Sequence, residues 1–441
     1  MIPVIFSENM TDSLFMMAST REQQIEQARL ATQDGRFWDA VEQYTEVLAH
    51  TDPQTSDPKE KKARLVSLKE RGDLLSELGE QVVALAAYEQ YYLEAGTSQH
   101  AVEALVLIGI RSRGLGQYGR SVTACHEALD LSTALNYTPG RAKALVGLGG
   151  TYLLQGEVNL AVNYLNQANA LFEQLNDVHG QARSSNQIGI AYATTGHFHK
   201  AIQAFEKSLA LARQAERHSG LVACLNNLGE CYQLLFATDK ALACHREGLA
   251  LAETAEFRLL EADLCRNLGL DLMQKEQWSE SFTYLQRAKA LAEEIRAPEI
   301  YFHTLYALGR NSLAQGQAEG REYAQVLLES TTEPGRSRWH QANGLYVMGC
   351  YEQLAGNVST AEELWQRAIF LAHETENRVL LWQLHAALAQ IAQQLNLAAV
   401  HNRIAAEVIQ QIAEPFTDEA LKEGFLSAEP VTAVLNQLPR D

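Results

Sequence analysis

The chain has 441 residues and a formal net charge of −18, from 36 basic and 54 acidic side chains. This acidic balance argues against binding to the phosphate backbone of a nucleic acid, which requires a basic surface. No run of 18 apolar residues is present, so the sequence predicts no membrane-spanning helix. Six cysteines occur without a CxxC pair, which favours free thiols and a cytoplasmic protein over disulfides or metal ligands.

Residues 1–20 are interpreted as a lead-in that is disordered or caps the first helix. They contain apolar side chains but also Glu8 and Asp12, and they lack the basic start of a signal peptide. A polar stretch from Thr51 to Lys59 carries two prolines and predicts a loop. We therefore expect the repeated part of the chain to begin near residue 21.

Residues 109 to 349 carry a glycine at every fortieth position. These marker glycines are Gly109, Gly149, Gly189, Gly229, Gly269, Gly309 and Gly349. A large aliphatic residue precedes each one, and in five of the seven units another glycine follows seven residues later. A fixed period of this length is typical of stacked repeats, which have no single deep core and usually present a long surface to other proteins.

Each 40-residue unit is predicted to form two helices. Leu225, Leu228 and Tyr232 recur at helical spacing in a first helix, and Ala201 and Phe205 do so in a second helix. The marker glycine lies inside the first helix, where it costs about 1 kcal/mol relative to alanine. We therefore expect a neighbouring helix to pass too close to the glycine to admit a Cβ atom.

The glycine seven residues after a marker is predicted to end the first helix in a left-handed conformation. Phe236 and Glu276 replace that glycine in two units. The unit of Gly309 has Arg321 and Leu328 where other units have small residues, so its packing is expected to differ.

The 40-residue period ends near Glu414, and residues 413–441 are predicted to form capping helices and a tail. Thr417 followed by Asp418 is typical of a helix start. One further helix carries an apolar stripe of Val431, Val434, Leu435 and Leu438. A solenoid needs such a segment to cover the open face of its last repeat.

The unit around Gly189 has the fullest motif, with the run Gln187-Ile-Gly-Ile-Ala-Tyr192 followed by Gly196, Phe198, Ala201 and Phe205. This motif resembles the tetratricopeptide repeat. The 40-residue period resembles the long-helix variant found in sensor regions of bacterial regulators, spindle-orientation scaffolds and kinesin light chains. Weaker copies lie at residues 28–44, 72–88 and around 389. The resemblance implies an all-α fold, a right-handed superhelical solenoid of about ten antiparallel helix pairs over residues 21–412.

No catalytic, metal-binding or cofactor-binding constellation stands out in the sequence. Residues 114–119 match the glycine spacing of a dinucleotide-binding loop, but they lie at a turn between two predicted helices and follow no strand. His197 and His199 flank another turn with no third ligand nearby, which favours solvated histidines over a metal site. The sequence therefore predicts a protein without enzymatic activity, cofactor or metal.

The resemblance implies that the first helices of all units line a concave groove, where asparagines hold the backbone of a bound peptide. A carboxamide suits this role because it both donates and accepts. Asn or Gln stands two residues before the marker glycine in three consecutive units, although asparagine is a poor helix former. The predicted partner-binding residues, all expected to face solvent, are Arg183, Asn186, Gln187, Asn226, Asn227, Glu230, Gln233, Arg266 and Asn267. The alternative interpretation is an ordinary polar helix surface.

We expect a cytoplasmic scaffold for protein–protein interaction, which binds a peptide or helix of a partner protein in this groove. Self-association is a further option, and neither nucleic acid nor a membrane is expected as a partner. The alternative is a regulatory receptor of a bacterial signalling system, in which a bound peptide or metabolite changes the superhelical pitch. An output domain or an adjacent encoded regulator would distinguish the two.

Overall fold

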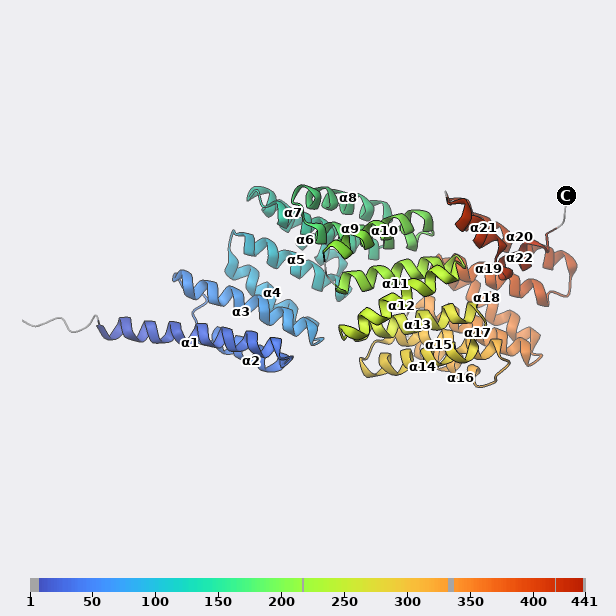
Figure 1. Cartoon of the computed structure of the whole chain (residues 1–441), viewed down its shortest axis with the longest axis horizontal. Helices are drawn as coiled ribbons and strands as arrows, with labels where there is room; N and C mark the ends of the chain where they lie inside the picture. Colours follow the sequence, from blue (N-terminus) through green and yellow to red (C-terminus); the bar gives the residue numbers. More distant parts are fainter. Residues whose placement is uncertain (1–7, 216–217, 332–336, 417, 439–441) are drawn as a thin grey trace, which may run out of the picture. The chain divides into compact units, whose positions relative to one another are not determined.

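The computed structural model describes residues 8–215, 218–331, 337–416 and 418–438, and within these ranges it is all helical (Figure 1). None of the described helices is long and apolar enough to cross a membrane. The helices are α1 Glu8–Gln33, α2 Phe37–Ala49, α3 Pro58–Glu77, α4 Gln81–Ala95, α5 Gln99–Gly114, α6 Tyr118–Ala134, α7 Thr138–Leu154, α8 Val158–Gln174, α9 Val178–Thr194, α10 Phe198–Gln214, α11 His218–Leu234, α12 Thr238–Thr254, α13 Arg258–Gln274, α14 Trp278–Glu294, α15 Pro298–Ala314, α16 Gly320–Thr331, α17 Arg338–Leu354, α18 Val358–Glu374, α19 Arg378–Ile391, α20 Leu395–Ala413, α21 Glu419–Ser427 and α22 Glu429–Leu435.

The chain divides into two compact units, residues 1–184 and 185–441, and the division lies inside α9. Within the units consecutive helices pack on one another, as α5 does on α6 and α13 on α14. Taken two at a time, α1 to α20 make ten pairs of a first and a second helix. The predicted all-α array of helix pairs is confirmed. The boundaries at residues 20 and 412 stay a prediction; α1 runs through the first of them and α20 ends beside the second.

The marker glycines lie where the two helices of a pair cross closely, as predicted. A Cβ atom on Gly189 would come within 2.5 Å of the Phe205 ring, and one on Gly269 within 2.6 Å of Leu285. In each case the facing residue stands 16 positions later, on the second helix of the same pair. The glycines thus let a large side chain of one helix lie directly on the backbone of the other, which offsets their low helix propensity.

The predicted left-handed helix ends are also confirmed. Gly196 has a φ of 74°, and His197 N–H donates to the Tyr192 carbonyl at 2.9 Å, closing the end of α9. Phe236 and Glu276 adopt the same conformation without the freedom of glycine, with φ values of 55° and 57°. A non-glycine residue in this region costs about 1–2 kcal/mol, so the repeat geometry imposes the turn on whatever residue stands there.

The pair α15/α16 departs from the others, as its sequence predicts. Helix α16 has 12 residues, whereas its counterparts α14 and α18 have 17 each. A Cβ atom on Gly309 would meet Val347 of α17 at 3.0 Å and no side chain of α16 within 4 Å. The Tyr351 hydroxyl donates to the Gly309 carbonyl at 3.1 Å and fills part of the space.

The C-terminal helices cover more than the last repeat. The Asp418 side chain accepts from Leu421 N–H at 3.1 Å and caps α21, while Thr417 lies outside the described residues. Phe425 is buried and stacks on Phe236, with ring centroids 6.3 Å apart and an interplanar angle of 24°. Phe416 lies 6.5 Å from the ring of His199. One hydrophobic cluster therefore joins α20–α22 to the start of α10 and to the turn before α12, which belong to the pairs five and four places before α19/α20.

Candidate functional site

Four asparagines of the second unit, Asn186, Asn226, Asn227 and Asn267, link the first helices α9, α11 and α13. Together with Gln187 they form the polar row. Asn227 Nδ2 donates to Asn186 Oδ1 at 3.1 Å, and Asn267 Nδ2 donates to Asn226 Oδ1 at 2.9 Å. In both bonds the partners are 41 residues apart, one repeat plus one residue. The marker-glycine period therefore places these carboxamides in contact across successive repeats.

A charged cluster continues this row between α11 and α13. The Arg266 guanidinium donates to Glu230 Oε1 at 2.8 Å and to Asp263 Oδ1 at 2.7 Å. Asn226 and Asn267 join the same carboxylates, at 2.9 Å to Asp263 and 3.1 Å to Glu230. Burial alone would lower the pKa of Arg266, but the two carboxylates raise it above its usual value. The cation is thus fully compensated within the protein.

The row is anchored in the core of its own repeats. Gln233 Nε2 donates to Asp271 Oδ1 at 2.6 Å and to the Asn267 carbonyl at 2.9 Å. The other carboxylate oxygen of Asp271 lies 2.6 Å from His245 Nδ1, and both side chains are completely buried. A satisfied buried network of this kind fixes the orientation of each member.

The expectation that all the predicted residues face solvent is wrong for Asn226, Gln233, Arg266 and Asn267. Their exposed fractions are 4%, 8%, 8% and 0%. The reason is that neighbouring first helices pack side by side, so their polar side chains bond to one another. The other predicted residues remain accessible: Arg183, which lies in the first unit, is exposed, whereas Asn186, Gln187, Asn227 and Glu230 are half-buried.

Two carboxamide oxygens in this row lack a donor. Gln187 Oε1 and Asn267 Oδ1 are buried and accept no hydrogen bond from any residue that the structure describes. A buried acceptor without a donor lowers the free energy of unfolding by about 1–3 kcal/mol, so such atoms are rare in the interior of folded proteins. The oxygen of the half-buried Gln187 marks a place where a donor from outside the chain would be stabilised, whereas Asn267 is enclosed by the protein.

Sequence reasoning missed the continuation of the row on α15 and α17. Three residues before the marker glycines Gly309 and Gly349 stand Tyr306 and Tyr346, and one residue after Gly309 stands Arg310. All three are half-buried. The Arg310 guanidinium lies 5.5 Å from the centre of the Tyr306 ring, and the phenol raises the pKa of Arg310. No carboxylate of the described residues forms a salt bridge with Arg310. The row thus changes from carboxamides to an arginine held between tyrosines.

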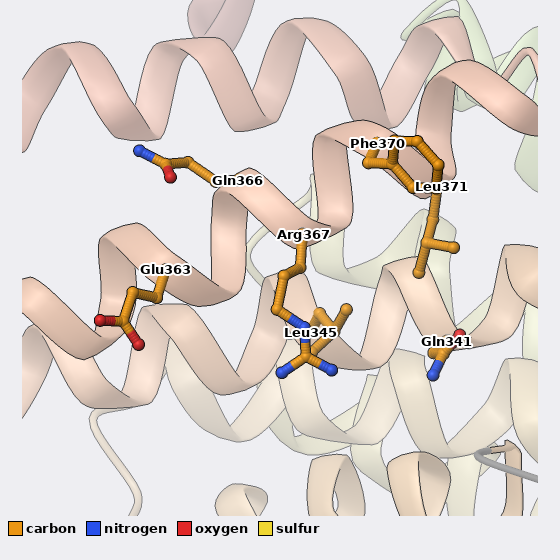
Figure 2. Close-up of a pocket in the computed structure, with 7 residues that line it drawn as sticks. All are labelled: Gln341, Leu345, Glu363, Gln366, Arg367, Phe370 and Leu371. Carbon is orange, nitrogen blue, oxygen red and sulfur yellow. The ribbon is translucent and has the colours of Figure 1, made fainter.

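A separate hollow of about 540 Å³ lies between α17 and α18. Figure 2 shows Arg367 reaching over Leu345, with Glu363 and Gln366 to one side and Phe370 to the other. The residues that line it belong to a single helix pair. It is confined to this pair, whereas the polar row spans several repeats.

Comparison with known proteins supports the repeat fold. Residues 180–254 match the tetratricopeptide repeat family, and no curated protein matches the chain in sequence. The chain is similar to a Rap protein complexed with Competence and Sporulation Factor (TM-score 0.61, 14% identity, 80% of this chain and 99% of that chain). It is also similar to the apo form of the quorum sensor NprR from B. thuringiensis (TM-score 0.51, 17% identity, 77% and 98%). A third similar structure is the Signal Transduction ATPase with Numerous Domains protein with a tetratricopeptide repeat sensor from Pyrococcus horikoshii (TM-score 0.52, 14% identity, 80% and 54%). Residues 180–254 thus match the tetratricopeptide repeat, and the helix pairs and the similar structures show that the chain has the fold of a tetratricopeptide-repeat solenoid.

Proposed function

We propose that the chain is a non-enzymatic protein-interaction module of the cytoplasm, which binds an extended peptide along the first helices α9 to α17 of its second unit. The observation that carries the proposal is the row of carboxamides on α9, α11 and α13. Its half-buried members Asn186, Gln187 and Asn227 present amide donors and acceptors, the Gln187 oxygen accepts no hydrogen bond from the described residues, and an extended peptide supplies N–H donors at regular intervals.

The accessible members of the row suit a peptide backbone. Asn186 and Asn227 are half-buried and bond to each other, so each keeps unused donor or acceptor positions. Gln187, which is also half-buried, offers an oxygen that accepts no hydrogen bond from the described residues. The buried members, Asn226 among them, position these groups and do not contact the peptide themselves.

The far end of the row favours an acidic group on the peptide. Glu230 and Asp263 already neutralise Arg266, whereas Arg310 lies beside Tyr306 and forms no salt bridge with a carboxylate of the described residues. A guanidinium held against an aromatic ring binds a carboxylate in a planar, two-pronged geometry. We therefore place an Asp, a Glu or the C-terminal carboxylate of the peptide beside Arg310.

A second candidate function is a receptor that responds to its peptide. The contact of Phe425 with Phe236 favours it, because this contact joins repeats that are not neighbours and changes whenever the twist between them changes. The similarity to a Rap protein complexed with Competence and Sporulation Factor and to the quorum sensor NprR also supports it. The two functions share one binding surface and differ in whether binding moves the C-terminal helices.

The test starts from peptides selected from a displayed random library by the wild-type chain and titrated by calorimetry. The double variant N186A/N227A removes both partners of one hydrogen bond, so it leaves no unpaired group in the free protein. R310Q removes the charge beside Tyr306, and Q203A changes an exposed residue of α10 as a control. We expect a loss of about 1–3 kcal/mol in binding for each variant, a factor of ten per 1.4 kcal/mol, and none for the control. Equal affinities for all proteins would place the binding surface elsewhere.

A further inference from the structure

Three side chains with metal-binding donor atoms meet near the starts of α15 and α17. Glu299 and His303 stand four residues apart on α15, and His340 lies on α17. One donor atom from each lies within 4.8 Å of the other two. His340 Nε2 is 2.7 Å from Glu299 Oε2, and the two imidazole rings are 4.6 Å apart at an angle of 80°.

The two histidines differ in exposure and in how tightly neighbouring rings enclose them, and this difference suits a binding site. His340 is 1% exposed and is held edge-on between the rings of Phe302, at 5.4 Å, and Trp339, at 5.2 Å. His303 is half-buried, lies with its ring 4.5 Å from that of Trp339 at a tilt of 51°, and forms no hydrogen bond with any residue that the structure describes. Glu299 is 72% exposed, and its hydrogen bond to His340 is the one contact that the structure gives its carboxylate among the described residues. One donor is therefore fixed and two can adjust around it.

We propose that Glu299, His303 and His340 form a binding site for a divalent cation of the zinc class. Tetrahedral zinc bound by nitrogen and carboxylate oxygen at about 2.0–2.2 Å requires donor atoms about 3.4 Å apart. The three donor atoms now lie within 4.8 Å of one another, so each has to move by little more than 1 Å to reach that spacing. Two imidazoles select zinc, cobalt or nickel over calcium and magnesium, which prefer oxygen ligands only.

The site has three protein ligands, and this leaves the fourth tetrahedral position to water or to a donor atom of another molecule. The cation would bridge two successive first helices, α15 and α17, which the hydrogen bond between His340 and Glu299 joins at this point. Cation binding at this site is independent of the proposed peptide binding, since the two sites consist of different residues and are tested with different ligands.

The simpler explanation of the cluster is an ion pair. The hydrogen bond between His340 and Glu299 accounts for two of the three residues, but it gives His303 no partner and no reason for its position. Another close histidine pair, His385 and His401, has its Nδ1 atoms 2.9 Å apart. That pair lacks a carboxylate within salt-bridge distance among the described residues, and it provides an internal control.

The test is a titration of the full chain, purified without a histidine tag and treated with a chelator, with Co²⁺ followed by visible absorption and with Zn²⁺ followed by calorimetry. We expect one equivalent of cation and the intense absorption of tetrahedral cobalt. E299Q and H303Q should each weaken binding by more than about 100-fold, because loss of even an outer partner of a metal ligand costs about 10–100-fold. H401Q should bind as the wild type does.

The metal-free melting temperatures separate a lost ligand from a lost fold. E299Q and H303Q alter accessible side chains, so their metal-free melting curves should match that of the wild type, and only the wild type and H401Q should melt higher with Zn²⁺. Absence of binding by the wild type, undiminished binding by E299Q and H303Q, or loss of binding in H401Q would each overturn the proposal.

Discussion

The substitution G229A tests the close crossing of paired helices most directly. A Cβ atom at this position would collide with the imidazole of His245, which is completely buried. The ring cannot turn aside freely, because its Nδ1 lies 2.6 Å from Asp271 and its Nε2 lies 3.3 Å from the Asn226 carbonyl. Relief of the collision must therefore move a helix or break the polar network.

The expected size of the effect follows from three contributions. Overpacking costs about 1–3 kcal/mol, a weakened hydrogen bond about 0.5–1.5 kcal/mol, and the better helix propensity of alanine returns about 1 kcal/mol. The net loss is about 2 kcal/mol, which lowers the melting temperature of the second unit by about 4–8 °C. Scanning calorimetry and circular dichroism measure this change.

The same helix offers a matched control. Gly220 also lies in α11, but a Cβ atom there would meet no atom within 4 Å. G220A should therefore leave stability unchanged or raise it by up to about 1 kcal/mol through helix propensity alone. If G229A proves as stable as G220A, the marker glycines are not required by packing, and the explanation of the 40-residue period is wrong.

Two further changes test other parts of the fold. F425A removes a ring that is 2% exposed and should destabilise the second unit by about 3–5 kcal/mol, whereas an unchanged calorimetric transition would mean that the contact with Phe236 contributes nothing. Burial and the neighbouring His401 lower the pKa of His385 to about 4, so the folded chain binds fewer protons than the unfolded chain between that pH and about 6.5. His385 therefore removes up to about 3 kcal/mol of stability as the pH falls through this window; a wild type and an H385Q variant that lose stability equally between pH 7 and 4 would contradict it.

Much of the fold was predictable because each repeat is a local structure. The marker glycines, the facing residue on the second helix and the left-handed turn lie within one stretch of sequence, so their spacing is visible there. At Phe236 and Glu276, where the sequence lacks the glycine, the turn is left-handed as well, since the neighbouring repeats impose the conformation. The different packing around Gly309 was expected from the loss of small residues in that unit.

The site was predictable in position but not in environment. Counting from the glycines found Asn226 and Asn267, but their burial depends on how closely successive first helices approach, which no single repeat encodes. The cluster of Glu299, His303 and His340 escaped notice because its members come from two repeats at a spacing of no known metal motif. The contact of Phe425 with Phe236 depends on the twist accumulated over several repeats.

The stacking of Phe425 on Phe236 changes the thermodynamic description of the second unit. In an open solenoid each repeat contacts only its neighbours, so terminal repeats fray independently and the free energies of the repeats simply add. Here the C-terminal segment of α20–α22 also contacts the start of α10 and the turn before α12. The contacts between successive repeats therefore form a closed ring. A closed chain of contacts has no free terminal repeat, and the loss of any one repeat breaks an interface at both of its sides. The second unit is therefore expected to unfold as a single cooperative body, and a ligand bound at any of its repeats stabilises all of them.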